Sequence, residues 1–165
     1  MLLASLLPRT SAADEYGLRL SVGGGGAARW VAGNRGAAGT VEATLAFKNV
    51  GLVSAGVLAF PDGLDYAYGE LGIYLGLSIA AGLGYGSYAS PTGRSSGLAE
   101  HLFVGVPIPI GEHIEQFTEK GTLCPYLVPY YRPSWGPWPG VAHELGLMIK
   151  ISYGLKAEGG KFGGG

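Results

Sequence analysis

The 165-residue sequence predicts an all-β fold, and three features of the chain lead to this prediction. Glycine supplies 31 residues, and because each glycine inside a helix costs about 1 kcal/mol, a helical bundle is disfavoured. Apolar residues alternate with small or polar residues over most of the chain, as in strands whose successive side chains point to opposite faces. Short segments rich in Gly, Pro, Asn and Asp separate the alternating stretches and are typical of turns.

The composition excludes several classes of function. Charged residues make up only 14% of the chain, where a soluble domain averages about 25%. The formal net charge of −1 lacks the basic excess that accompanies nucleic-acid binding. The single cysteine excludes an internal disulfide framework and a cysteine-based zinc site. We expect neither a metal nor a cofactor.

Eight strands are expected from the alternation. They cover residues 16–23, 40–48, 51–60, 66–79, 82–90, 98–110, 122–132 and 143–155. The clearest is the fourth, where Leu and Ile occupy every odd position from Leu71 to Ile79, so that a tight turn is expected near Ala81. The facing of 122–132 stays open because Pro125 and Pro129 interrupt it. A membrane helix over the uncharged residues 71–93 is an alternative, but a helix would not sort its large apolar residues onto one parity.

The expected connections differ in length at the two ends of the sheet. One end has a Gly-rich loop over 23–39 and further loops over 61–63, 90–97 and 133–140. The other end has tight turns, except for the charged segment 111–121. Long loops at one end and short turns at the other are typical of outer-membrane barrels.

The parity opposite to the large apolar residues carries Gly, Tyr and a balanced set of charges. The expected charged residues are Arg19, Glu42, Lys48, Glu70, Glu144 and Lys150. If these side chains pair inside a closed sheet, the apolar parity faces hydrocarbon and every backbone group is satisfied internally. The sequence therefore predicts an eight-stranded antiparallel up-and-down transmembrane β-barrel over residues 14–156, with a polar network in its lumen.

Aromatic residues near the predicted strand ends fit this arrangement, because Tyr and Trp suit the boundary between water and lipid. The expected interface residues are Tyr16, Phe47, Tyr85, Tyr131, Trp135, Trp138 and Tyr153. In the alternative, a soluble barrel of the lipocalin kind, these rings pack in the core.

Both ends of the chain differ in composition from the predicted barrel. Residues 1–13 form a short apolar run followed by small residues at Ser11 and Ala13, which predicts the remnant of a signal peptide. Residues 157–165 are rich in glycine and are expected to form a flexible tail.

The stretches 16–20, 70–76, 125–131 and 144–155 make the chain resemble the small eight-stranded outer-membrane β-barrel proteins of Gram-negative bacteria. This resemblance implies a location in the bacterial outer membrane with membrane lipid as a partner. It also implies contact with envelope proteins through the loops or the 111–121 connection. The expected function is a structural or envelope-interaction role without catalysis.

Two alternative functions stay open. Glycines on the inward parity could leave a narrow channel for small or apolar solutes. Some barrels that the chain resembles modify lipid A, and such an enzyme needs a serine activated by a histidine. The local set that fits is His101 with Ser95 or Ser96 and Glu100. His113 and His143 are expected at opposite ends of the barrel, too far apart to share a metal.

Overall fold

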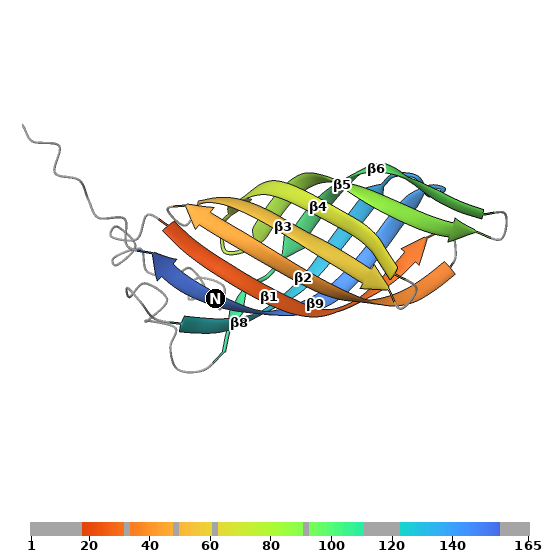
Figure 1. Cartoon of the computed structure of the whole chain (residues 1–165). Helices are drawn as coiled ribbons and strands as arrows, with labels where there is room; N and C mark the ends of the chain where they lie inside the picture. Colours follow the sequence, from red (N-terminus) through yellow and green to blue (C-terminus); the bar gives the residue numbers. More distant parts are fainter. Residues whose placement is uncertain are drawn as a thin grey trace, which may run out of the picture.

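A computed structural model describes residues 18–31, 34–47, 50–60, 63–90, 93–110 and 123–155, which form one antiparallel sheet. Its strands are β1 (Leu18–Val31), β2 (Asn34–Phe47), β3 (Gly51–Phe60), β4 (Gly63–Tyr74), β5 (Ser78–Ser90), β6 (Gly93–Gly105), β7 (Ile108–Pro109), β8 (Leu123–Trp135) and β9 (Val141–Leu155). Chain neighbours pair from β1 to β6, β9 pairs with β8 and β1, and β6 pairs with β8 (Figure 1). The short β7 continues β6 along β8, so eight long strands close into a barrel. The predicted all-β, eight-stranded antiparallel barrel is confirmed.

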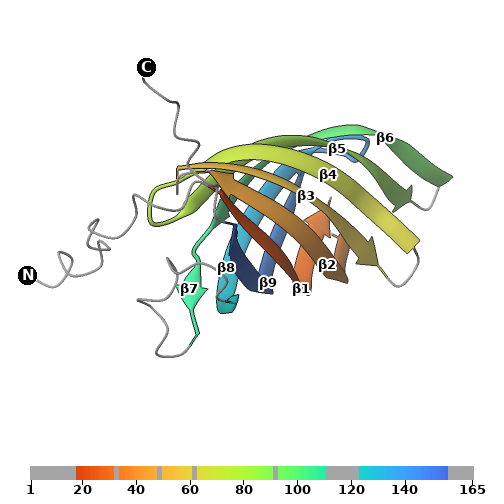
Figure 2. The same ribbon diagram turned by 60° about the vertical axis from the view of Figure 1, so that its left-hand side comes forward.

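The barrel has two ends, which we call the terminal end and the far end. At the terminal end, on the left of Figure 1, Leu18 of β1 pairs with Leu155 of β9. The far end holds the connections 32–33, 61–62, 91–92 and 136–140. These connections are short, so the expectation of long loops at this end is wrong. Figure 2 shows β7 beside β8 at the terminal end, within the long connection between β6 and β8.

The Gly-rich segment 23–39 is strand rather than loop. The β1–β9 pairing continues through it up to Trp30 opposite His143. A Cβ added at Gly23 would lie 2.3 Å from Lys150 Cγ, and one at Gly25 would lie 1.9 Å from the Leu147 carbonyl oxygen. The glycines are therefore required for the close approach of β9 to β1, a use of glycine in strands that a loop-based interpretation misses.

The turn between β4 and β5 lies earlier than the alternation predicts. β4 ends at Tyr74, and residues 75–77 form the turn, with Gly76 at a φ of 78°. This left-handed conformation suits glycine. The prediction of one strand over 66–79 with a turn near Ala81 is wrong, because Leu75 stays exposed in the turn and so continues the odd-position pattern. The alternative of a helix over 71–93 is also wrong, and within the described residues no helix is long and apolar enough to cross a bilayer.

Prolines interrupt the seam between β6–β7 and β8. Val106 N donates to Pro129 O and Ile110 N donates to Pro125 O, both at 3.0 Å. The reverse bonds cannot form, because proline has no N–H. Leu102 and Pro133 fall between the pairs His101–Ser134 and Val104–Tyr131, and Pro133 likewise has no N–H to donate across the seam. The seam therefore has fewer hydrogen bonds than an uninterrupted antiparallel ladder.

The polarity of the barrel is inverted relative to a soluble protein. Large apolar side chains are exposed on its outer face, including Leu71, Leu83 and Leu123, all above 60% exposed, and Leu98 at 82%. Inward positions hold ionisable side chains with 5% exposure or less: Glu42, Glu70, His101, Arg132, Glu144 and Lys150, together with Arg29. The facing of β8, which the sequence leaves open, is inward for its even-numbered residues from Cys124 to Ser134.

Candidate functional site

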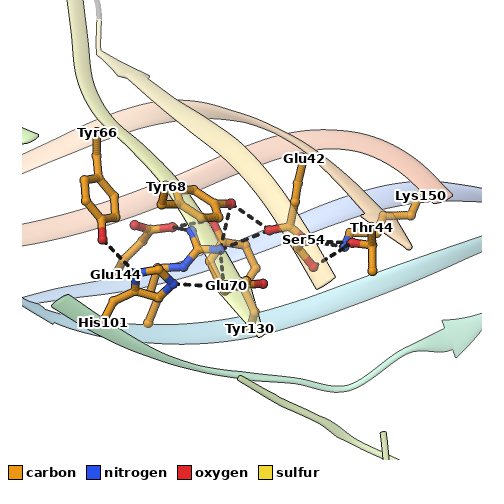
Figure 3. Close-up of polar contacts among 11 residues, drawn as sticks. Glu42, Thr44, Ser54, Tyr66, Tyr68, Glu70, His101, Tyr130, Glu144 and Lys150 are labelled. Carbon is orange, nitrogen blue, oxygen red and sulfur yellow. Dashed lines mark hydrogen bonds and ion pairs between the residues drawn. The ribbon is translucent and has the colours of Figure 1, made fainter. Parts of the chain in front are cut away.

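A cluster of ionisable side chains fills the middle of the barrel and is the candidate functional site. It is built from alternate residues of facing strands: Glu42 and Thr44 on β2, Ser54 on β3, Tyr66, Tyr68 and Glu70 on β4, His101 on β6, Tyr130 and Arg132 on β8, and Glu144 and Lys150 on β9 (Figure 3). Successive inward positions lie two residues apart in a strand, and each of these six strands contributes one or more polar side chains at this level. We call this set the lumen cluster.

Arg132 is the centre of the lumen cluster and is completely buried. Its Nη1 donates to Glu144 Oε1 at 3.0 Å, and its Nη2 donates to Glu42 Oε2 at 3.0 Å and to the Tyr68 hydroxyl at 2.7 Å. Glu70 Oε2 lies 3.8 Å from the same Nη2. One guanidinium therefore contacts carboxylates from three strands, because its planar fork presents donors in several fixed directions.

Aromatic rings enclose the Arg132 guanidinium. Its carbon lies 4.0 Å from the centre of the Tyr68 ring, 5.1 Å from that of Phe103 and 5.2 Å from that of Tyr130. The same tyrosines bind the carboxylates, since Tyr68 donates to Glu42 and Tyr130 to Glu144, each at 2.6 Å. Ring faces stabilise the cation while the hydroxyls donate to the anions, so both signs of charge have partners within the protein.

Lys150 forms the second cationic centre. Its ammonium pairs with Glu42 Oε1 and donates to Thr44 Oγ1 at 2.9 Å. Thr44 in turn lies 3.0 Å from Ser54 Oγ. Glu42 is thus shared between Lys150 and Arg132, which links β2, β8 and β9 through one carboxylate.

His101 belongs to the lumen cluster and not to the rim. Its Nε2 lies 2.9 Å from Glu70 Oε2, and its Nδ1 lies 2.7 Å from the Tyr66 hydroxyl. Glu100 is exposed on the opposite face of the strand, and Ser96 accepts a bond from Tyr85 on the outside of the barrel. Ser95 shares the inward parity of His101 but lies six residues further along β6, roughly 20 Å away at about 3.3 Å per residue. The grouping of His101 with Ser95 or Ser96 and Glu100 is therefore wrong, because Glu100 and Ser96 point to the opposite face and Ser95 is too distant.

The inward glycines make room for the large side chains of the lumen. A Cβ on these glycines would lie within 2.6 Å of a lumen side chain on the neighbouring strand: Gly56 against Tyr68, Gly82 against His101, Gly84 against Tyr66, and Gly146 against Tyr130. The space that each glycine leaves is thus already occupied. Glycine on the inward parity indicates a filled interior and not a gap.

Two apolar clusters lie on either side of the lumen cluster. Toward the terminal end, Leu52, Ala80, Val128 and Met148 pack together. Toward the far end, Val31, Leu58, Ala142 and Trp138 do so. Trp138 also stacks on Arg29, with the guanidinium carbon 4.4 Å from the ring centre. Packed apolar side chains therefore lie on both sides of the lumen cluster.

The predicted site residues divide into several groups. Glu42, Glu70, Glu144 and Lys150 lie in the lumen cluster, and Arg19 is half-buried on the inward parity near the terminal end. Tyr85, Tyr131 and Trp135 are exposed on the outer face toward the far end, and Phe47 and Tyr153 toward the terminal end. Trp138 is not an interface residue as predicted, because its ring turns back into the barrel and is 5% exposed. Tyr16, Lys48, His113 and the segments 1–13, 111–121 and 157–165 lie outside the described residues.

Sequence reasoning missed Arg132, Arg29 and the lumen tyrosines. Arg132 shares its parity with Cys124 and Tyr130, but the prolines of β8 obscure that alternation. Arg29 lies in the segment interpreted as a loop. The inward facing of His101 could be predicted from the sequence, because His101 alternates with the apolar residues Leu102 and Val104.

Within the described part of the chain, no group of three or more His, Cys, Asp or Glu residues could hold a metal ion. The cluster instead pairs its cations and carboxylates with each other. No protein-family model matches the chain, and no curated protein matches its sequence.

Proposed function

We propose that this chain is a membrane-spanning β-barrel of the bacterial outer membrane with a structural, envelope-interaction role and no catalytic activity. The single observation that carries the proposal is the inverted polarity of the barrel. Its outer face is covered by exposed Leu, Ile and Val, and its interior holds the lumen cluster.

Physical chemistry explains why this arrangement suits a bilayer. In water each exposed apolar side chain costs roughly 25 cal/mol per Å² of apolar surface, whereas in hydrocarbon the same surface costs nothing. A closed barrel satisfies its backbone groups between strands, as a membrane requires. The long strands have 10 to 15 residues, enough for the tilted span of about 9–11 residues.

A closed scaffold is favoured over a channel. The interior of an eight-stranded barrel is just wide enough for its side chains. Here tyrosines and His101 occupy the space beside the inward glycines, and apolar clusters lie toward both ends. No buried serine is bonded to His101, which leaves the enzyme alternative without support among the described residues.

The membrane proposal is tested by refolding the chain into vesicles of phosphatidylcholine. We expect β-rich circular dichroism, flotation with the vesicles after an alkaline wash, and faster gel migration of the unheated barrel than of the heated chain. A folded monomer that stays in the aqueous phase without detergent would contradict the proposal.

The closed interior is tested by conductance in planar bilayers, with a bacterial porin as positive control. We expect no conductance steps above the lipid baseline from the refolded barrel. Regular steps that persist in independent preparations would support the channel alternative instead. For the interaction role, pull-down from native outer membranes after mild cross-linking identifies any stoichiometric envelope partner.

A further inference from the structure

A shallow groove runs over β1 on the outer face of the barrel. It has a volume of about 520 Å³ and is lined by Gly26, Ala28, Pro129, Leu145 and Leu147, together with the backbone between them. The register sets Gly26 between Gly39 and Leu147, and Ala28 between Ala37 and Leu145. The groove exists because β1 and β2 carry small residues where the neighbouring strand β9 carries leucines.

A row of nitrogen-bearing side chains lies one outward position beyond the groove, toward the far end. Trp30 on β1 pairs with His143 on β9 and with Arg35 on β2. All three share the outward parity of the groove residues, with Arg35 and His143 exposed and Trp30 half-buried. We call these three residues the cationic row, after the positive charge of Arg35.

The cationic row offers hydrogen-bond donors to an anion. Within the described part of the chain, the Arg35 guanidinium makes no hydrogen bond or ion pair. The Tyr131 hydroxyl lies 2.6 Å from His143 Nδ1, and when the phenol donates to this atom, Nε2 carries the imidazole proton. The exposed carboxylate of Glu100 lies on β6, and β8 separates it from His143.

We propose that the groove and the cationic row together bind a membrane lipid with an anionic phosphate headgroup. One acyl chain lies over Gly26 and Ala28, and the phosphate contacts Arg35, whose fork of donors matches phosphate oxygens, with His143 and Trp30 beside it. The inference rests on the proposed membrane location, since acyl chains reach this face only in a bilayer.

Charge complementarity decides between this lipid and a second copy of the chain. In a symmetric dimer centred on the cationic row, Arg35 of one copy would lie close to Arg35 of the other. Like charges brought together at an interface disfavour that contact. An anionic headgroup above an apolar chain matches both parts of the surface.

Two variants separate the parts of the site. Arg35→Gln removes the charge of the cationic row. Gly26→Leu fills the groove, and a Cβ at this position has only the Ala38 carbonyl oxygen within reach, at 4.0 Å, so the outward side chain fits without strain. Arg94→Gln is the matched control, because Arg94 is also exposed at the far end but donates to Ser87 on β5 at 2.7 Å.

The experiment measures lipids retained by the barrel in native mass spectrometry. The barrel is released from nanodiscs that contain equal amounts of phosphatidylglycerol and phosphatidylcholine with identical acyl chains. We expect the wild type and Arg94→Gln to retain phosphatidylglycerol preferentially. The preference should fall about fivefold in Arg35→Gln, the effect of one arginine at an anionic lipid surface. Gly26→Leu should lower the total amount of retained lipid.

The outcomes distinguish the two proposals. If the barrel inserts but the wild type and Arg35→Gln show equal preference, the lipid site is overturned and the membrane barrel stands. Equal loss of preference in Arg94→Gln overturns the site as well, because it indicates nonspecific attraction. If millimolar inorganic phosphate displaces phosphatidylglycerol, the cationic row binds a free anion, and the lipid site is overturned. A chain that never inserts overturns both proposals.

Discussion

Arg132 lies at the centre of the lumen cluster and bonds Glu42, Tyr68 and Glu144 at 3.0 Å or less. Removing one partner of a buried ion pair costs about 3–5 kcal/mol, because the other charge stays buried without compensation. We therefore expect Arg132→Met to lose that much stability against urea in vesicles, followed by gel migration without heating. Arg35→Gln, an exposed change of the same charge, should unfold like the wild type. Equal stability of the two variants would contradict the role given to Arg132.

Inward and outward glycines should respond differently to the same small change. A Cβ at Gly146 would lie 2.4 Å from the Tyr130 ring, whereas one at Gly69 on the outer face meets only the Ser54 carbonyl oxygen at 3.8 Å. Overpacking costs about 1–3 kcal/mol. We expect Gly146→Ala to be destabilised by that amount in urea and Gly69→Ala to be unchanged. If both variants match the wild type, the lumen is looser than its packing indicates.

Part of the lumen cluster could be predicted from single residues. Glu42, Glu70, Glu144 and Lys150 each alternate with large apolar residues, so their strand parity alone gives their facing. Trp138 could not be predicted in this way, because it lies in a connection where no parity applies and its ring folds back over Arg29. Which charged side chains pair depends on the register between neighbouring strands. The sequence of a single strand does not determine that register.

The prolines of β8 leave hydrogen bonds unmade between β8 and β6–β7, so the pairing of β8 is the easiest to strengthen by one substitution. Pro129→Val supplies an N–H opposite the Val106 carbonyl oxygen, and one net hydrogen bond contributes about 0.5–1.5 kcal/mol. We expect this variant to unfold at higher urea concentration and to slow amide exchange in β6. Leu127→Val, on the same outward face of β8, adds no donor and is the control. Faster exchange in Pro129→Val would show that the proline fits the strand better than a residue with an N–H.

The number and order of strands followed from alternation, but several of their ends did not. The alternation continues through the β4–β5 turn because Leu75 is exposed like an outward strand residue. The far-end halves of β1 and β2 are interpreted as a loop from the sequence because they are rich in glycine. In β1 the deciding contacts come from another strand, since a Cβ at Gly23 would meet Lys150 and one at Gly25 would meet Leu147. Such close approaches are tertiary and cannot be found from the local sequence.

At the scale of the whole molecule, the single cysteine reports whether the barrel is closed. Cys124 points inward and is 3% exposed. We expect maleimide to label it in the vesicle-bound barrel only at the rate of global unfolding, with the same urea midpoint as the loss of fast gel migration. An added outward cysteine, Leu83→Cys, tests accessibility to a lipid-soluble maleimide without unfolding. Rapid labelling of Cys124 below the unfolding midpoint would indicate local opening at the terminal end.

The lumen cluster has a consequence for how the barrel assembles. Its ionisable members come from β2, β4, β6, β8 and β9, and a slip of one residue in any of these strands turns its side chains to the other face. A misaligned strand would therefore put a carboxylate or a cation on the outer face, which lies in hydrocarbon in the proposed membrane location, and leave its partner buried without a counter-charge. The charges thus penalise pairings that are displaced by one residue and favour completion of the ring in a single cooperative step.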